Sequence, residues 1–344
     1  MMKLRNKIIS ILLPLTLSIS GCLGVNVQTV QAKEVTETAK TTDSKFSFNP
    51  HVCPEGFYKA YGEEYWTSFF NLCDALREGK DTFKCASGDA YVWCMVGGAL
   101  PNLFPAERNC TEYLGLYDGY SNGVGKISYS IPKEEFVKRE REFEKKIEDV
   151  LNANVKKSDT DFEKCAALYK YIVDNYAYDH DYFDGMTAGT VNNWEYGIYR
   201  TFMTGKGICG NLSGLYNYLL LQCGVDAYEF HDAGRVHAWS YVVADGVGYH
   251  VDPTWGFSLE NFMTPSSVRK KRLEEGNITG ALEPMYYLDD VPLKKAGIDF
   301  SANDDRFAEL RKGWTILEVD RDRKVIKYDS EDGVKEFAYG KLNK

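Results

Sequence analysis

The chain has 344 residues, of which 44% are hydrophobic and 26% charged, as in a globular protein of two or three domains. Its formal net charge is −9 at pH 7, which argues against a nucleic-acid partner. The densest basic run, Arg269 to Arg272, is followed by two glutamates, and we expect it to form a solvated helix face.

The N-terminus has the features of an export signal. Three basic residues among the first seven precede an apolar run from Ile8 to Ile19, which is too short to span a bilayer comfortably. Two processing sites compete. A bacterial lipobox-like sequence ends at Cys22, which would be lipidated and attach the protein to the membrane, whereas a small-residue site after Ala32 would release it. Either processing site predicts a protein outside the cytoplasm. It would be lipid-anchored on the outer face of a bacterial cell in the first case and secreted in the second.

We divide the chain into five parts. They are a signal peptide (1–32), a flexible tether rich in Thr, Lys and Glu (33–48), an N-terminal accessory region (49–157), a central core (158–284) and a C-terminal β-rich segment (285–344).

The accessory region is predicted to be mainly helical. Six large residues between Tyr58 and Leu76 recur at helical spacing, which predicts one helix that ends at Gly79. Asn122-Gly123 predicts a turn before a strand over 126–131, and an amphipathic helix is expected over 133–151.

Nine cysteines must be explained in an exported protein. Apart from Cys22 and Cys209 there are seven, and five of these lie between residues 53 and 110, so we expect disulfides there. An odd number leaves at least one unpaired, and the connectivity stays open. No CxxC pair is present, which argues against a structural zinc site, and no metal ion is predicted.

In the central core, one cysteine lies where a helix should begin. After a helix from about Ser158 to Tyr176, Gly205 and Gly207 allow a sharp turn, and a leucine periodicity starts just after Cys209. The sulfur is therefore expected in the first helical turn, where unpaired N–H groups and the helix dipole stabilise a thiolate. Taken alone, Cys209 fits a buried structural cysteine or a disulfide partner as well.

A hairpin follows this helix. Strands are expected over 225–230, 236–244 and 247–252. Asp245-Gly246 is a two-residue hairpin signal, which pairs Ala244 with Val247. Counting outward places His237 diagonal to Asp252 on one face, with Cα atoms about 7–8 Å apart. An imidazole oriented by a carboxylate can take a thiol proton and later return it to a leaving group.

Three motifs together resemble the transglutaminase-like superfamily, the papain-like cysteine fold in circularly rearranged order. They are Gly-Lys-Gly-Ile-Cys before an amphipathic helix, His-Ala-Trp on a strand, and His-Val-Asp-Pro-Thr-Trp closing a hairpin, within about residues 158–257. The resemblance implies an α+β fold in which the helix bearing the cysteine packs on an antiparallel sheet bearing the histidine and aspartate. It further implies Cys209 as nucleophile, His237 as general base and acid, and Asp252 as orienting carboxylate.

Three aromatic residues are expected to line this site. Tyr199, ten residues before Cys209, matches an aromatic position common in bacterial members of the family and would lie near the oxyanion. Trp239 and Trp255 closely follow the predicted triad members and would wall the site. Core packing fits these three aromatics equally well. At the C-terminus, short β segments over 315–319, 324–328 and 334–339 predict a small appended sheet.

These features predict an exported cysteine enzyme that attacks an amide carbonyl through a thioester. A peptidase or amidase acting on extracellular protein or cell-wall peptide is the leading interpretation. A protein-cross-linking transglutaminase and a non-enzymatic surface or binding module are the alternatives. No cofactor and no nucleic-acid partner are expected, and the only membrane attachment predicted is through a lipidated Cys22. The sequence leaves the oligomeric state open.

Overall fold

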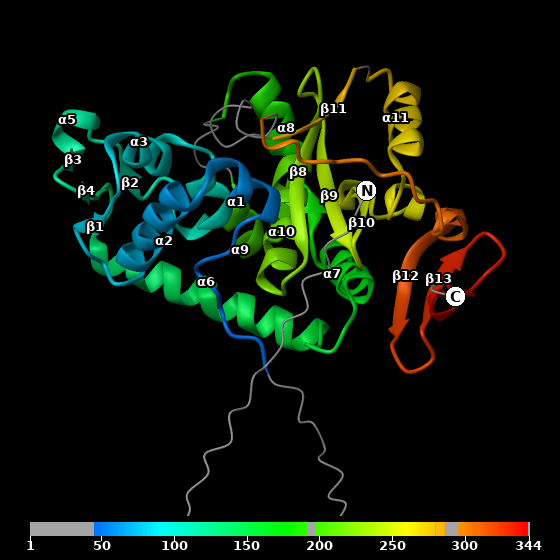
Figure 1. Ribbon diagram of the computed structural model, residues 1–344. Coiled ribbons are helices and arrows are strands. Elements are labelled where there is room, and N and C mark those ends of the chain that lie inside the picture. Colours follow the sequence, from blue (N-terminus) through cyan, green and yellow to red (C-terminus); the bar gives the residue numbers. More distant parts are fainter. Residues whose placement is uncertain (1–44, 192–196, 279, 286–294, 343–344) are drawn as a thin grey trace, which may run out of the picture. The chain divides into compact units, whose positions relative to one another are not determined.

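The computed structural model describes residues 45–191, 197–278, 280–285 and 295–342. The predicted signal peptide, Cys22, the cleavage site after Ala32 and most of the tether lie outside these residues. The described residues belong to one compact unit with a mixed α+β fold, as predicted (Figure 1). Among the residues described, none of the helices combines the length and the apolarity needed to cross a membrane.

The centre of this unit is a four-stranded antiparallel sheet with two helices packed against it. The strand order is β10-β9-β8-β11. The strands are β8 (Asp226–Asp232), β9 (Ala238–Ala244), β10 (Val247–Val251) and β11 (Leu282–Pro284). Helix α10 (Cys209–Gln222) contacts β8, β9 and helix α7 (Asp161–Asn175). A cysteine-bearing helix packed on an antiparallel sheet is the core arrangement that the sequence predicts.

The hairpin between β9 and β10 has the predicted register. Ala244 pairs with Val247, and the ladder continues to Ser240 and Val251. The loop residues Asp245 and Gly246 have φ values of 51° and 80°. Two left-handed residues give the turn whose twist matches that of the flanking strands, and this requirement explains the Asp-Gly pair.

The two faces of the sheet belong to different hydrophobic cores. Side chains such as Val242 and Val251 pack with α7 and α10, whereas Phe230, Trp239 and Tyr241 pack with helices of the N-terminal region. Because side chains alternate across a strand, both faces of the sheet are covered. Burial of each large apolar side chain stabilises the fold by about 1.5–3 kcal/mol.

The N-terminal region is mainly helical, as predicted. Its helices are α1 (Glu55–Tyr61), α2 (Glu63–Arg77), α3 (Gly88–Val96), α4 (Ala99–Leu103), α5 (Leu116–Gly119) and α6 (Lys133–Asn154). Its short strands are β1 (Thr82–Lys84), β2 (Thr111–Glu112), β3 (Tyr120–Ser121), β4 (Val124–Lys126) and β5 (Ser128–Tyr129).

Two predictions for this region need correction. The single helix over 58–76 is wrong, because Gly62 has φ 86° and separates α1 from α2. The strand over 126–131 is replaced by β4 and β5, which pair with different partners. The turn at Asn122-Gly123 and the long helix α6 are confirmed.

The remaining elements surround the central sheet. They are helices α8 (His180–Thr187), α9 (Ile198–Thr204) and α11 (Ser266–Glu275), the parallel pair β6 (Ala177–Tyr178) and β7 (Lys206–Gly207), and the C-terminal sheet of β12 (Gly313–Asp320), β13 (Val325–Ser330) and β14 (Lys335–Ala338). The predicted C-terminal sheet is therefore confirmed. It is joined to α7 through Glu163, which accepts hydrogen bonds from Lys324 (2.7 Å) and Tyr339 (2.6 Å).

The expectation of disulfides between residues 53 and 110 is wrong. All eight cysteines among the described residues are free thiols, and six of them are buried. These six lie within the hydrophobic cores, where a thiol packs as a small apolar side chain. Burial also raises the pKa of thiols such as Cys73 and Cys165, which keeps them protonated.

Candidate active site

Cys209 is the first residue of α10, as the leucine periodicity predicts. The preceding turn requires two glycines. Gly205 ends α9 with φ 78°, and a Cβ on Gly207 would come within 2.7 Å of the Thr201 side chain. The thiol is half-buried at the helix tip, where unpaired N–H groups and the helix dipole favour an anion.

His237 is held by a loop that Asp232 organises. Strand β9 begins at Ala238, two residues later than predicted, because the Asp232 carboxylate accepts the N–H groups of Val236 (2.8 Å) and His237 (2.7 Å). The same carboxylate accepts the N–H of Gly234 at 2.7 Å. Asp232 was not singled out from the sequence, and it fixes the backbone that carries the imidazole.

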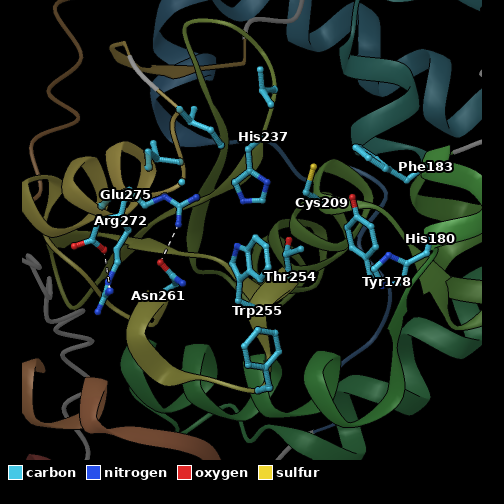
Figure 2. Close-up of a pocket in the computed structure, with 16 residues that line it drawn as sticks. Tyr178, His180, Phe183, Cys209, His237, Thr254, Trp255, Asn261, Arg272 and Glu275 are labelled. Carbon is cyan, nitrogen blue, oxygen red and sulfur yellow. Dashed lines mark hydrogen bonds and ion pairs between the residues drawn. The ribbon is translucent and has the colours of Figure 1, made fainter. Parts of the chain in front are cut away.

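Asp252 follows β10 and lies against that imidazole. His237 Nε2 is 2.7 Å from Asp252 Oδ2, and Asp252 is fully buried. Its other oxygen accepts the N–H of Thr254 at 3.1 Å. The thiol of Cys209 lies beside the imidazole and contributes to raising its pKa. Because Nε2 faces the carboxylate, Nδ1 is the ring nitrogen left for the sulfur. The three predicted triad residues therefore lie together, and Figure 2 shows two of them, Cys209 and His237.

The charges of the site stabilise one another. Burial lowers the pKa of His237, but Asp252 and Cys209 outweigh it and raise that pKa to about 9. Burial raises the pKa of Asp252, but the charges of His237 and Arg269 and the hydrogen bonds from His237 and Thr254 hold it well below its usual range. A carboxylate and an imidazolium are therefore favoured at neutral pH.

Arg269 is a member of this cluster that sequence reasoning missed. It is only 2% exposed, so a solvated face is the wrong description for this residue of the basic run. Its Nη2 is 2.9 Å from Asp252 Oδ2, and its Nη1 donates to Asn261 Oδ1 at 3.0 Å. In α11, Arg269 and Leu273 are the buried pair, one turn apart. That i,i+4 relationship was the available signal that Arg269 faces inward.

Trp239 lies beneath the imidazole and does not line the cavity. It is fully buried, and its ring is stacked with that of His237 at a centroid distance of 6.1 Å. Its Nε1 donates to Nδ1 of His250 at 3.0 Å. Burial and the charge of Arg269 lower the pKa of His250 to about 3, so this ring is neutral and its Nε2 donates to Ser266 Oγ at 3.1 Å.

The other two predicted lining residues have different locations. Trp255 lines the cavity and is 44% exposed, with its ring centroid 6.1 Å from that of His237. Tyr199 lies elsewhere, with the Arg139 guanidinium 3.7 Å from its ring centroid and Phe143 beside it. It is absent from the described lining of the Cys209 cavity.

The cavity over Cys209 has a volume of about 670 Å³. Tyr178 is the aromatic residue next to the sulfur, and its hydroxyl points toward Cys209 in Figure 2. Burial, and to a smaller extent the electrostatic interaction with Cys209, raises the pKa of Tyr178 to about 12. The phenol is therefore a hydrogen-bond donor at neutral pH. Within the described ranges, no group of three or more His, Cys, Asp or Glu side chains is placed to hold a metal ion.

The family comparison agrees with the fold around this cavity. Residues 149–253 match the model of the transglutaminase-like superfamily, a segment that contains Cys209, His237 and Asp252. This segment of the chain is therefore similar to the transglutaminase-like superfamily, which agrees with the resemblance stated from the three motifs.

The chain was also compared with solved structures and with curated proteins. A crystal structure of a candidate cysteine protease from Cytophaga hutchinsonii is 16% identical, with a TM-score of 0.22, over 41% of this chain and 48% of that one. The chain thus covers about half the length of that protein. No curated protein matches the chain.

Proposed function

We propose that this protein is a cysteine peptidase or amidase that cleaves an amide bond through a thioester on Cys209. One observation carries the proposal. A thiol at a helix N-terminus lies beside an imidazole whose Nε2 is 2.7 Å from a buried carboxylate. This arrangement supplies a thiolate nucleophile together with a general acid and base.

The reaction follows from the two ring nitrogens of His237. The Cys209 thiolate attacks the carbonyl carbon, a C–S bond forms, and negative charge develops on the carbonyl oxygen. His237 gives its Nδ1 proton to the amide nitrogen, the C–N bond breaks and the amine leaves. Neutral His237 then takes a proton from water, the resulting hydroxide attacks the thioester, and the acid product leaves as the thiolate–imidazolium pair is restored.

Two donors are assigned to the developing oxyanion. One is the backbone N–H of Cys209, which is the first residue of α10 and so has no carbonyl partner within the helix. The other is the hydroxyl of Tyr178, which takes the role that the sequence had given to Tyr199. Removal of one such donor in an acyl-transfer enzyme costs about 10²–10³-fold in kcat.

The substrate is proposed to be an extracellular protein or peptide. This rests on the N-terminal sequence, with its basic start, apolar run and competing processing sites at Cys22 and Ala32. A lipidated Cys22 would keep the enzyme at the cell surface, and cleavage after Ala32 would release it.

Alkylation of the thiol tests the proposal. The chain from residue 33 is treated with iodoacetamide at about pH 6, where an ordinary thiol is almost fully protonated. Fast modification of Cys209, mapped by mass spectrometry, is expected in the wild type and in His180→Ala, which changes an exposed residue of the same cavity. It should be lost in His237→Ala. If Cys209 reacts no faster than a thiol of the unfolded chain, the enzymatic proposal is overturned.

A second assay separates hydrolysis from transfer. Peptide products are measured beside incorporation of a labelled primary amine into acceptor protein. Product release without incorporation supports a hydrolase. Incorporation that exceeds hydrolysis identifies the cross-linking alternative, and the absence of both, with an unreactive Cys209, identifies a binding module.

A further inference from the structure

We propose that the cavity over Cys209 selects peptides with a bulky apolar side chain next to the scissile amide, held by Trp255 and Phe257. This inference rests on the proposed function and adds the substrate class. It starts from the unusual exposure of apolar side chains around the sulfur. Four large apolar side chains that line this cavity are exposed to solvent: Phe183 (38%), Trp255 (44%), Val236 (66%) and Phe257 (70%).

These four side chains come from three separate segments of the chain. Phe183 lies on α8, Val236 precedes β9, and Trp255 and Phe257 follow β10. Local sequence therefore does not explain why they meet at one opening. Because contiguous exposed apolar surface is costly in water, its concentration around a nucleophile indicates a surface that a ligand covers.

Trp255 and Phe257 form the best-defined part of this surface. Their rings are perpendicular, with an interplanar angle of 89° and centroids 6.1 Å apart, which makes an apolar corner. The Trp255 ring also lies 6.1 Å from the His237 ring, so the Trp255 wall of this corner is beside the reacting groups (Figure 2). An apolar side chain next to the scissile bond would be buried between these two rings.

The charges of the cavity are already compensated. Arg269 and Arg272 are the guanidinium groups in its described lining. Arg269 is paired with Asp252, and Arg272 with Glu260 (2.9 Å) and Glu275 (3.0 Å). A charged substrate side chain would lose its hydration and would have to compete with these pairs for a partner. The lining therefore favours an apolar over a charged residue at this subsite.

Peptides with one varied residue test this inference. A Gly/Ala background carries Phe, Leu, Ala, Glu or Lys at a single position, and mass spectrometry maps the cleaved bond. We expect kcat/KM for Phe and Leu to exceed that for Ala by about 10-fold or more, with Glu and Lys below Ala.

The matched variants are Phe257→Ala, Phe257→Asp and Tyr117→Ala. The first should reduce the Phe-over-Ala ratio about 10-fold, and the second should make Lys a better substrate than Phe. Tyr117 is 96% exposed and lies outside the cavity, so its variant should keep the wild-type ratio. Alkylation of Cys209 by iodoacetamide should be as fast in Tyr117→Ala as in the wild type.

The alkylation rate of Cys209 distinguishes failure of the apolar subsite from failure of the proposed function. Equal kcat/KM across the peptides, or a preference for Glu or Lys, with fast alkylation of Cys209 overturns the apolar subsite and leaves the proposed function standing. An unchanged Phe-over-Ala ratio in Phe257→Ala also overturns it. Slow alkylation of Cys209 in the wild type, with no peptide cleaved, overturns the proposed function and the subsite with it.

Discussion

Arg269 and His237 share one oxygen atom of Asp252. Nη2 of Arg269 lies 2.9 Å and Nε2 of His237 lies 2.7 Å from Asp252 Oδ2. The carboxylate is fully buried, and two cations compensate the loss of its hydration. The Arg269 guanidinium is 4.3 Å from the Trp239 ring centroid, so the imidazole, carboxylate, guanidinium and indole form one buried cluster.

Removal of Arg269 should weaken both folding and catalysis. Arg269→Met leaves a buried carboxylate with one cation, which should lower the free energy of unfolding by about 3 kcal/mol or more. The pKa of Asp252 should rise, so the acid limb of the kcat/KM profile moves to higher pH. Urea unfolding and pH–rate profiles measure the two effects.

Two variants serve as controls for Arg269→Met. Arg269→Lys should recover part of the stability and return the acid limb toward the wild-type position, because it restores a cation. Lys270→Met changes the neighbouring exposed residue and should change neither quantity. An Arg269→Met protein with wild-type stability and the same acid limb would show that the ion pair with Asp252 has no such role.

His237 should make stability depend on pH in a defined direction. Its pKa is raised in the folded protein to about 9 by Asp252 and Cys209. A raised pKa contributes stability fully below the unfolded value of about 6.5, and the contribution is lost as pH rises through about 9. The stability advantage of the wild type over His237→Asn should thus be largest near pH 6 and shrink toward pH 9.5.

Denaturant unfolding at several pH values measures that advantage. His180→Asn is the matched control, because His180 lines the same cavity but is exposed. Its difference from the wild type should change little across the range. A wild-type advantage over His237→Asn that grows with pH would contradict the assignment of the raised pKa.

Tyr178 and Tyr199 should respond differently to loss of the hydroxyl. Tyr178→Phe removes an assigned oxyanion donor and should lower kcat by about 10²-fold. Alkylation of Cys209 should stay fast, because the thiolate–imidazolium pair is intact. Tyr199→Phe should have wild-type kcat, since Tyr199 packs on Arg139 and Phe143 away from the sulfur. Equal kcat for the two variants would remove Tyr178 from the oxyanion site.

The eight cysteines of the chain from residue 33 should titrate in distinct groups with a thiol reagent such as DTNB. Cys209 is expected to react fast in the native protein. Cys53 is half-exposed, but burial and the charge of Asp226 raise its pKa to about 12, so it should react slowly. The six buried thiols should react only after unfolding. Fewer than eight thiols in unreduced, denatured protein would reveal a disulfide that contradicts the structure.

The local features of the site could be predicted from the sequence because each depends on neighbouring residues. The helix that begins at Cys209 follows from two glycines and a leucine period, and the strand register follows from the Asp245-Gly246 turn. Parity along the hairpin then places His237 and Asp252 on one face. Helix α6 and the C-terminal sheet were predictable for the same reason.

Errors arose where distant segments decide the environment of a residue. The cysteines between 53 and 110 looked like disulfide partners, but their spacing along the chain does not reveal whether two sulfurs meet. Tyr199 had the expected distance from Cys209 in sequence, but α9 carries it toward Arg139 on α6. The break at Gly62 interrupts a continuous helical pattern, because a single left-handed residue leaves little trace in apolar periodicity.

The sequence by itself determined the chemistry of this protein's core: a cysteine at a helix tip, and a histidine and an aspartate in register across a hairpin. These are short-range consequences of turn chemistry and side-chain period. Only the tertiary structure decided that Arg269 is buried and paired with Asp252. It also decided that Tyr178, Trp255 and Phe257 line the cavity over the sulfur. Those contacts join α8, α11 and the segment after β10, and their energies come from burial and charge pairing between segments that no local pattern connects.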